Sequence, residues 1–181
     1  METVKITIKG KTPLLMNRFR SSQIESKTKK RTGAVVEDDY TSKLYLTEDE
    51  KPYVPSAYLR GMLIEAGKQF KIQGKGKATY SKLLGSAIEV NPDAIEIISE
   101  GYKPFVISAV NPTTKGRMIV KRPMFEDWSL KFEIAVLDDG VPVDVLKDII
   151  EHGGNYVGIG DWRPNKKGKY GKFMVTEYSI M

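Results

Sequence analysis

The sequence predicts an α+β fold in which an antiparallel sheet is covered on one face by two helices. Three observations support this prediction. Apolar and polar residues alternate over 4–8 and again over 128–136, which is typical of strands with one buried face. Two other segments repeat their apolar residues at helical spacing. Along the chain, these elements give the order strand, helix, strands, helix, strand.

The first strand is defined by Val4, Ile6 and Ile8. Residues 17–43 then show little periodicity, and we expect 17–54 to form a long insertion between the first strand and the first helix. Within the insertion, the apolar residues 44–46 and 53–54 flank a charged turn, which indicates a small hairpin. A loop of this length inside a small domain is usually functional or disordered.

The first helix is predicted over 57–71, with Ser56 as its N-cap. A shorter helical turn is expected over 80–85. Short strands follow, separated by breaks at Asn91-Pro92 and Asn111-Pro112. The segments expected as these strands are 88–90, 95–98, 105–110 and 118–120.

The second helix is expected to begin at Pro142, which fits a first turn, and to end at Gly153-Gly154. Phe173 and Val175 begin the last strand. This order is the β-α-β-β-α-β plan of ferredoxin-like and RRM-like folds. We therefore expect a single domain over 1–181 with the insertion at 17–54.

Composition excludes several classes of site. The 181 residues are 40% hydrophobic and 29% charged, which is typical of a globular protein. The absence of cysteine excludes disulfides, a thiol nucleophile and Cys-based zinc sites. His152 is the only histidine, so a His-rich metal centre is excluded too. We expect no cofactor, no metal, no signal peptide and no membrane span, and a cytoplasmic location.

The positive charge is compatible with a polyanionic partner. Lysines and arginines number 29 against 23 acidic residues, which gives a net charge of +6. Part of this charge is concentrated in the insertion, where Lys27, Lys29, Lys30 and Arg31 stand within five residues. Such a run is either a solvated loop or a nucleic-acid-binding arm.

The loop 157–173 is the strongest functional signal. Glycine allows positive φ and a close approach to backbone N–H groups, which can form an anion-binding nest. Cations neutralise phosphates, and flat aromatic rings stack on bases. Together these features predict a groove for single-stranded nucleic acid, whereas the alternative is a solvated hairpin. The residues concerned are Gly158, Gly160, Trp162, Arg163, Lys166, Lys167, Gly168, Lys169, Tyr170 and Gly171.

Other glycine-rich motifs fit this loop less well. A dinucleotide-binding fingerprint requires a third glycine where Arg163 stands. That fingerprint also lies between a strand and a following helix, whereas this loop follows a predicted helix. A phosphate-binding P-loop requires Ser or Thr after Gly-Lys, where this chain has Tyr170.

The loop resembles the signature of the RAMP superfamily. In that signature, an apolar residue precedes Gly-x-Gly, a basic stretch follows, and a second pair of glycines flanks an aromatic residue. The members of this superfamily are the repeat-associated proteins of CRISPR systems, built on ferredoxin-like folds. The match is Val157-Gly158-Ile159-Gly160 and then Gly168-Lys169-Tyr170-Gly171. The segment 53–61, YVPSAYLRG, is similar to the start of the first helix in CRISPR backbone subunits.

The resemblance implies that Ser56 and Arg60 face the backbone of a guide RNA. Tyr58 stands where a second small hydroxyl residue is common in the family. The resemblance also implies that the insertion forms a thumb or lid. It further implies that the protein associates with further copies of itself or with other CRISPR-type subunits. A phage-encoded or stand-alone relative of this superfamily is the alternative to a backbone subunit.

Three functional hypotheses remain open at this stage. The first is binding of single-stranded RNA, or of DNA, without chemistry. The second is an endoribonuclease that uses Asp38 or Asp39 with a metal ion, or His152 as acid or base. The third is a protein-interaction module, such as a phage factor, that binds no nucleic acid.

Overall fold

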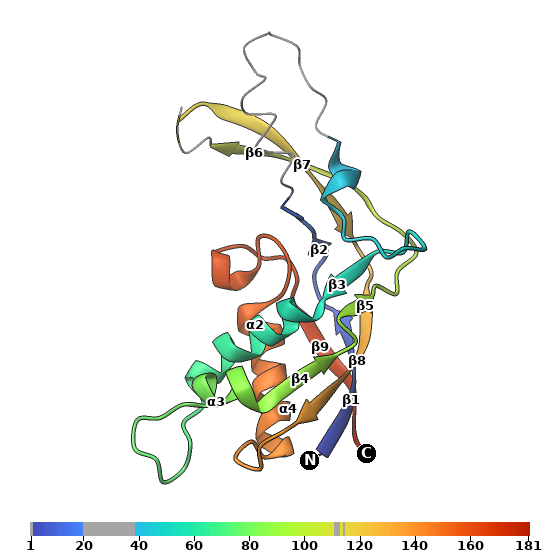
Figure 1. The fold of residues 1–181 in the computed structure, drawn as a ribbon. Coiled ribbons are helices and arrows are strands. Elements are labelled where there is room, and N and C mark those ends of the chain that lie inside the picture. Colours follow the sequence, from blue (N-terminus) through green and yellow to red (C-terminus); the bar gives the residue numbers. More distant parts are fainter. Residues whose placement is uncertain (1, 20–38, 111–112, 114) are drawn as a thin grey trace.

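The computed structural model describes residues 2–19, 39–110, 113 and 115–181. As predicted, the chain combines helices with antiparallel sheets (Figure 1). The strands are β1 (Glu2–Gly10), β2 (Leu14–Leu15), β3 (Tyr53–Pro55), β4 (Ile88–Asn91), β5 (Ala94–Glu96), β6 (Lys103–Val110), β7 (Arg117–Phe125), β8 (Ser129–Val136) and β9 (Phe173–Ile180). The α-helices are α2 (Ser56–Ala66), α3 (Tyr80–Ala87) and α4 (Val143–His152).

The main sheet has the order β4-β8-β1-β9, and all three of its pairings are antiparallel. β1 and β8 lie at its centre, where Ile6 is opposite Phe132. The alternation predicted from the sequence is confirmed, because Val4, Ile6 and Ile8 are buried while the residues between them are not. The buried side chains belong to the core that also contains Leu63 of α2 and the apolar residues of α4.

The opposite face of the main sheet is polar. Lys5 forms an ion pair with Glu133 on the neighbouring strand, at 3.7 Å. The Thr7 hydroxyl donates a hydrogen bond to Glu177 at 2.6 Å. A shallow depression of about 870 Å³ lies over these side chains. Helices therefore cover one face of the sheet, and the other face carries a ladder of charged and hydroxyl groups.

The middle strands do not all join the main sheet, which corrects the predicted arrangement. β6 and β7 form a long antiparallel hairpin that pairs with β2 in a separate three-stranded sheet. The hairpin projects away from the helices (Figure 1). Val106, Val110 and Ile119 are exposed on it. The apolar pattern predicted these strands, but partner choice depends on contacts between distant segments, which local pattern does not encode.

The start of α2 also differs from the prediction. Pro55 is the N-cap, and Ser56 is the first helical residue. The Ser56 hydroxyl donates to Asp93 Oδ1 at 3.1 Å instead of capping the helix. α2 ends at Ala66 and continues only as a short 3-10 turn, η2 (Gly67–Gln69), so the helical segment is shorter than 57–71.

As predicted, the second α-helix ends at Gly153-Gly154, because α4 ends at His152 and Gly153 is its C-cap. The prediction did not include the π-helical turn that follows, η3 (Gly153–Val157), in which Gly153 keeps right-handed helical angles. A Cβ at Gly153 would collide with Met62 of α2. A Cβ at Gly154 would lie 2.6 Å from the carbonyl oxygen of Phe173. The two glycines therefore allow the turn to pack closely against α2 and β9.

Trp128 is a core residue, as the sequence indicates. Its side chain is 2% exposed, and its indole N–H donates to the carbonyl oxygen of Thr12 at 2.8 Å. Gly10 leaves room for the indole, because a Cβ there would overlap its ring. Within the described part of the chain, the helices are too short or too polar to cross a bilayer.

Candidate functional site

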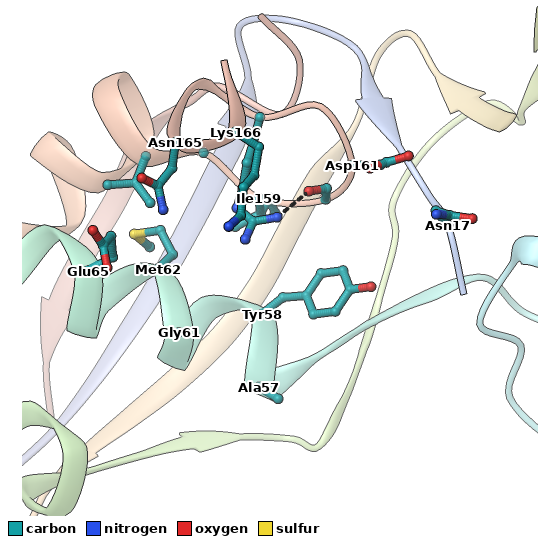
Figure 2. A pocket seen from close by; sticks show the side chains of 14 residues that line it. Asn17, Ala57, Tyr58, Gly61, Met62, Glu65, Ile159, Asp161, Asn165 and Lys166 are labelled. Carbon is teal, nitrogen blue, oxygen red and sulfur yellow. Dashed lines mark hydrogen bonds between the residues drawn. The ribbon is translucent and has the colours of Figure 1, made fainter. Parts of the chain in front are cut away.

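A groove of about 480 Å³ lies between α2 and the glycine-rich loop (Figure 2). This volume is within the range of ligand-binding clefts, about 300–1,000 Å³. One wall is the exposed face of α2, and the other is the segment from Val157 to Lys166. The groove is lined by Asn17, Ala57, Tyr58, Gly61, Met62, Glu65, Val157, Gly158, Ile159, Gly160, Asp161, Arg163, Asn165 and Lys166.

The wall formed by α2 follows from helical geometry. Tyr58, Gly61 and Glu65 are spaced by three and four residues and so share one face of the helix. Leu59 and Leu63 point into the core from another face. Gly61 exposes helix backbone in the groove, and apart from the backbone of α2 itself nothing lies within 4 Å of the place that a Cβ would take.

The loop wall depends on glycine at two positions. Gly158 has φ +70° and Gly160 has φ +80°, as the prediction of positive φ required. A Cβ at Gly158 would lie 2.7 Å from Pro164, and one at Gly160 would lie 2.5 Å from the carbonyl oxygen of Leu15. The absence of a side chain at these two glycines therefore allows close packing of other segments of this protein.

The predicted nest of free amide groups is not formed, which corrects the expected mechanism of anion binding. Most N–H groups of the loop already have carbonyl acceptors. These bonds run from Gly158 to Gly153 (2.8 Å), from Ile159 to Gly171 (3.0 Å), from Asp161 to Leu15 (2.8 Å) and from Gly171 to Pro13 (2.8 Å). Among the described residues, the N–H of Gly160 has no acceptor. Recognition of an anion by this loop therefore rests on side chains and on at most a few amides.

The charges that line the groove are balanced. Arg163 and Lys166 supply two cations, and Glu65 and Asp161 supply two carboxylates. The Arg163 guanidinium donates to the carbonyl oxygen of Gly160 at 2.9 Å, which holds it against the loop. Asp161 forms an ion pair with Arg122 of β7, with Nε 2.8 Å from Oδ2. Glu65 pairs with Lys68 one turn further along the chain.

Tyr58 is the aromatic side chain of the groove, and it projects from α2 toward Asn17 (Figure 2). Its hydroxyl donates to the hydroxyl of Tyr45 at 3.4 Å, and the two rings meet edge to face at 5.8 Å between centroids. Burial raises the pKa of Tyr58 above its ordinary value, with the hydrogen bond to Tyr45 as a second cause. The phenol therefore stays neutral at physiological pH.

Ser56 and Arg60 lie away from this groove. They line a smaller depression on another side of α2, together with Glu89 and Asp93. Arg60 donates a hydrogen bond to the carbonyl oxygen of Gly85. Residues two apart on a helix point about 200° from each other, so Arg60 cannot share a face with Tyr58.

The other aromatic and cationic residues of the loop do not line the groove. The Tyr170 ring packs on Phe105 of β6 at 5.3 Å between centroids, and the Lys169 ammonium lies 5.7 Å from the centroid of the Tyr170 ring. Trp162 has φ +51°, and its carbonyl oxygen accepts a hydrogen bond from the Tyr170 N–H. Lys167 has a left-handed conformation after a short 3-10 turn. Tyr170 therefore packs against the hairpin instead of facing the groove.

The candidate catalytic residues have structural contacts. Asp39 caps the 3-10 turn η1 (Tyr40–Lys43) by accepting from the N–H and hydroxyl of Thr41. His152 packs against Phe70 and Tyr156, with centroid distances of 5.5 and 4.7 Å. Across the described residues, no three potential ligands cluster to hold a metal ion. Asp38 and the basic run of Lys27, Lys29, Lys30 and Arg31 lie outside the described residues.

Sequence reasoning missed Tyr58, Gly61 and Glu65 as parts of the site. The spacing of the core residues Leu59 and Leu63 contains the signal, because it assigns the remaining face of the helix. No local signal indicates that this face would meet the glycine loop.

Comparisons with known proteins support the fold. No family model and no curated protein sequence matches the chain. Among solved structures, a chain in the cryo-EM structure of the type III-B Cmr-beta bound to cognate target RNA is similar, with a TM-score of 0.61 and 14% identity. The match covers 99% of this chain and 60% of that chain. At this identity, the likeness establishes a shared fold.

Proposed function

We propose that this protein binds single-stranded RNA along the groove between α2 and the glycine-rich loop, as a backbone-type subunit of a CRISPR-like ribonucleoprotein. The observation that carries the proposal is the groove itself. Arg163 and Lys166 lie on one wall, a neutral aromatic ring lies on the other, and the Gly160 N–H lacks an acceptor among the described residues. Phosphates would lie against the cations and the amide, and a base against Tyr58.

The topology supports a ferredoxin-like assignment for the main sheet. β1 and β4 flank β8, and β8 and β9 flank β1, with α2 and α3 joining the first pair and α4 joining the second. This is the split β-α-β arrangement of that fold. An RRM-like reading of RNA on the open sheet face has less support. That mode uses outward aromatic residues, whereas β1 and β8 present Lys5, Thr7, Lys131 and Glu133 there.

The structural neighbour supports the choice of ligand and partners. It is part of a type III-B Cmr-beta assembly bound to target RNA. By analogy, this chain would join further copies or other subunits along an RNA strand. The exposed apolar residues of the β6–β7 hairpin, Val106, Val110 and Ile119, supply a surface that a partner could cover.

Fluorescence anisotropy with labelled single-stranded RNA tests the proposal, with single-stranded DNA as a second arm. We expect saturable binding to RNA whose affinity falls steeply as salt is raised, by a slope of about −0.7 for each phosphate neutralised. Flat anisotropy at low salt would contradict the proposal and favour a protein-interaction module. Recovering the RNA intact afterwards separates binding from cleavage. If RNA is cut, Asp38→Ala, Asp39→Ala and His152→Ala identify the residue responsible.

The groove makes a prediction about individual cations. Arg163→Ala and Lys166→Ala should each weaken RNA binding several-fold and lower the salt slope by about 0.7. Lys131→Ala is the matched control, because it removes the same charge from the opposite face of the sheet. Equal losses in all three variants would show that the protein binds RNA through its overall charge instead of the groove.

A further inference from the structure

We propose that Arg122, on the β6–β7 hairpin, is a positioning residue that makes the groove competent for an anion by neutralising Asp161. This inference rests on the proposed function. Arg122 does not line the groove, but Asp161 does. The effect of Arg122 on the ligand therefore passes through the carboxylate that it holds.

The geometry of the pair supports this role. Arg122 Nε donates to Asp161 Oδ2 at 2.8 Å, and the two side chains are 17% and 23% exposed. The other carboxylate oxygen accepts a hydrogen bond from the N–H of Trp162 at 3.1 Å. Both oxygens of Asp161 are thus engaged. A charge-assisted hydrogen bond between partly buried groups is stronger than one at an exposed surface.

The charge balance shows why the groove needs this pair. Among the residues that line it, two cations face two carboxylates, so the lining alone has no excess of positive charge. Arg122 adds the charge that cancels Asp161. Without Arg122, the Asp161 carboxylate would face an incoming phosphate from within a few residues of Arg163, where like charges repel. With Arg122 in place, Arg163 and Lys166 give the groove a net positive charge.

The pair also connects two elements that are distant in sequence. Arg122 is opposite Phe105 in the hairpin, and Phe105 packs on Tyr170 of the glycine loop. The loop is therefore held by an ion pair and by an aromatic contact on the same part of the hairpin. A partner that shifts the hairpin would change the charge presented in the groove.

A double-mutant cycle tests the inference, with labelled single-stranded RNA as the probe and anisotropy as the readout. Arg122→Ala should weaken binding by about tenfold or more, because it leaves a partly buried carboxylate unpaired. Asp161→Asn should bind at least as well as the wild type, since the amide oxygen can still accept from Trp162. The double variant Arg122→Ala/Asp161→Asn should recover to within about twofold of the wild type.

Two controls separate positioning from stability and from general charge. Lys103→Ala breaks an exposed ion pair with Glu126 on the same hairpin and should change affinity by less than about twofold. Urea unfolding of each variant shows whether it is folded under the binding conditions. If Arg122→Ala is unfolded, the comparison of Arg122→Gln with Arg122→Gln/Asp161→Asn replaces it, because glutamine removes the positive charge and keeps a long polar side chain; the same rescue is expected.

The outcomes are distinguishable. If the wild type binds no RNA, the proposed function fails, and this inference fails with it. If the wild type binds but the double variant stays as weak as Arg122→Ala, Arg122 acts by direct contact or by holding the loop, and the inference is overturned. Unchanged affinity in Arg122→Ala would also overturn it. Recovery by Asp161→Asn supports it, because a purely structural role would not be rescued by removing the second partner.

Discussion

Gly160 shows how a residue chosen for backbone geometry shapes the site. Its φ of +80° is strained for any side chain, and a Cβ would lie 2.5 Å from the carbonyl oxygen of Leu15. Gly160 lines the groove, and its N–H has no acceptor in the part of the chain that the structure describes. The sequence indicated that the backbone at this glycine could have positive φ. It could not predict that Leu15, from a distant strand, occupies the space that the missing side chain leaves.

We expect Gly160→Ala to lower the free energy of unfolding by about 2 kcal/mol or more, through strain at positive φ and the clash with Leu15. Gly85→Ala is the matched control. Gly85 lies within α3 with open space around it, so alanine there should stabilise the protein by about 0.5–1 kcal/mol. Urea denaturation measures both. A neutral Gly160→Ala would mean that the loop does not hold its left-handed conformation in solution.

Tyr178 gives a prediction about pH. Its hydroxyl donates to the carbonyl oxygen of Val143 at 2.5 Å, and burial raises its pKa from 10.0 to about 12. The folded state therefore holds this proton more tightly than the unfolded state. The resulting stabilisation is present below pH 10 and is lost as the pH rises toward 12.

We expect the difference in unfolding free energy between the wild type and Tyr178→Phe to shrink as the pH rises from 10 toward 12. Chemical denaturation at several pH values on both sides of 10 measures it. Phenylalanine keeps the ring and removes only the titrating hydroxyl. A difference that stays constant over this window would show that the hydroxyl titrates normally in the folded protein.

At the scale of elements, periodicity predicted the strands and the apolar faces of the helices, because burial on one face leaves a local signature. The ends of the helices were predicted less well. Serine usually caps a helix, but here the Ser56 hydroxyl donates to Asp93 and Pro55 is the N-cap. Gly153-Gly154 marks the end of α4 as predicted, but the sequence did not indicate the π-helical turn that follows, where Met62 packs beside Gly153.

The close contact of η3 with α2 predicts that Gly153 and Met62 are coupled in their effect on stability. Gly153→Ala should destabilise the protein by about 1–3 kcal/mol, because the added methyl group meets the Met62 side chain. Combined with Met62→Ala, the loss should be less than the sum of the two single losses, by at least about 0.5 kcal/mol. Thermal or urea unfolding of the four proteins gives the coupling. Simple additivity would contradict the packing of η3 on α2.

At the scale of the whole molecule, the sequence predicted the mixture of helices and antiparallel strands but not the division of strands between sheets. β6 and β7 have the same short apolar pattern as strands of the main sheet, yet they pair with β2. The groove belongs to this scale too. It exists because α2 and the loop after α4, about a hundred residues apart in sequence, meet over one face of the main sheet. Of the loop residues that the sequence indicated, Gly158, Gly160, Arg163 and Lys166 line the groove. Ser56 and Arg60 lie on another side of α2.

Mapping where RNA lies on the protein is the most direct test of RNA binding in the groove. Single-stranded RNA containing 4-thiouridine would be crosslinked by light, and the linked peptides identified by mass spectrometry. We predict crosslinks in 57–65 of α2 and 157–166 of the loop, on opposite walls of the groove. Crosslinks confined to the open face of the main sheet, around Lys131 and Glu133, would contradict it.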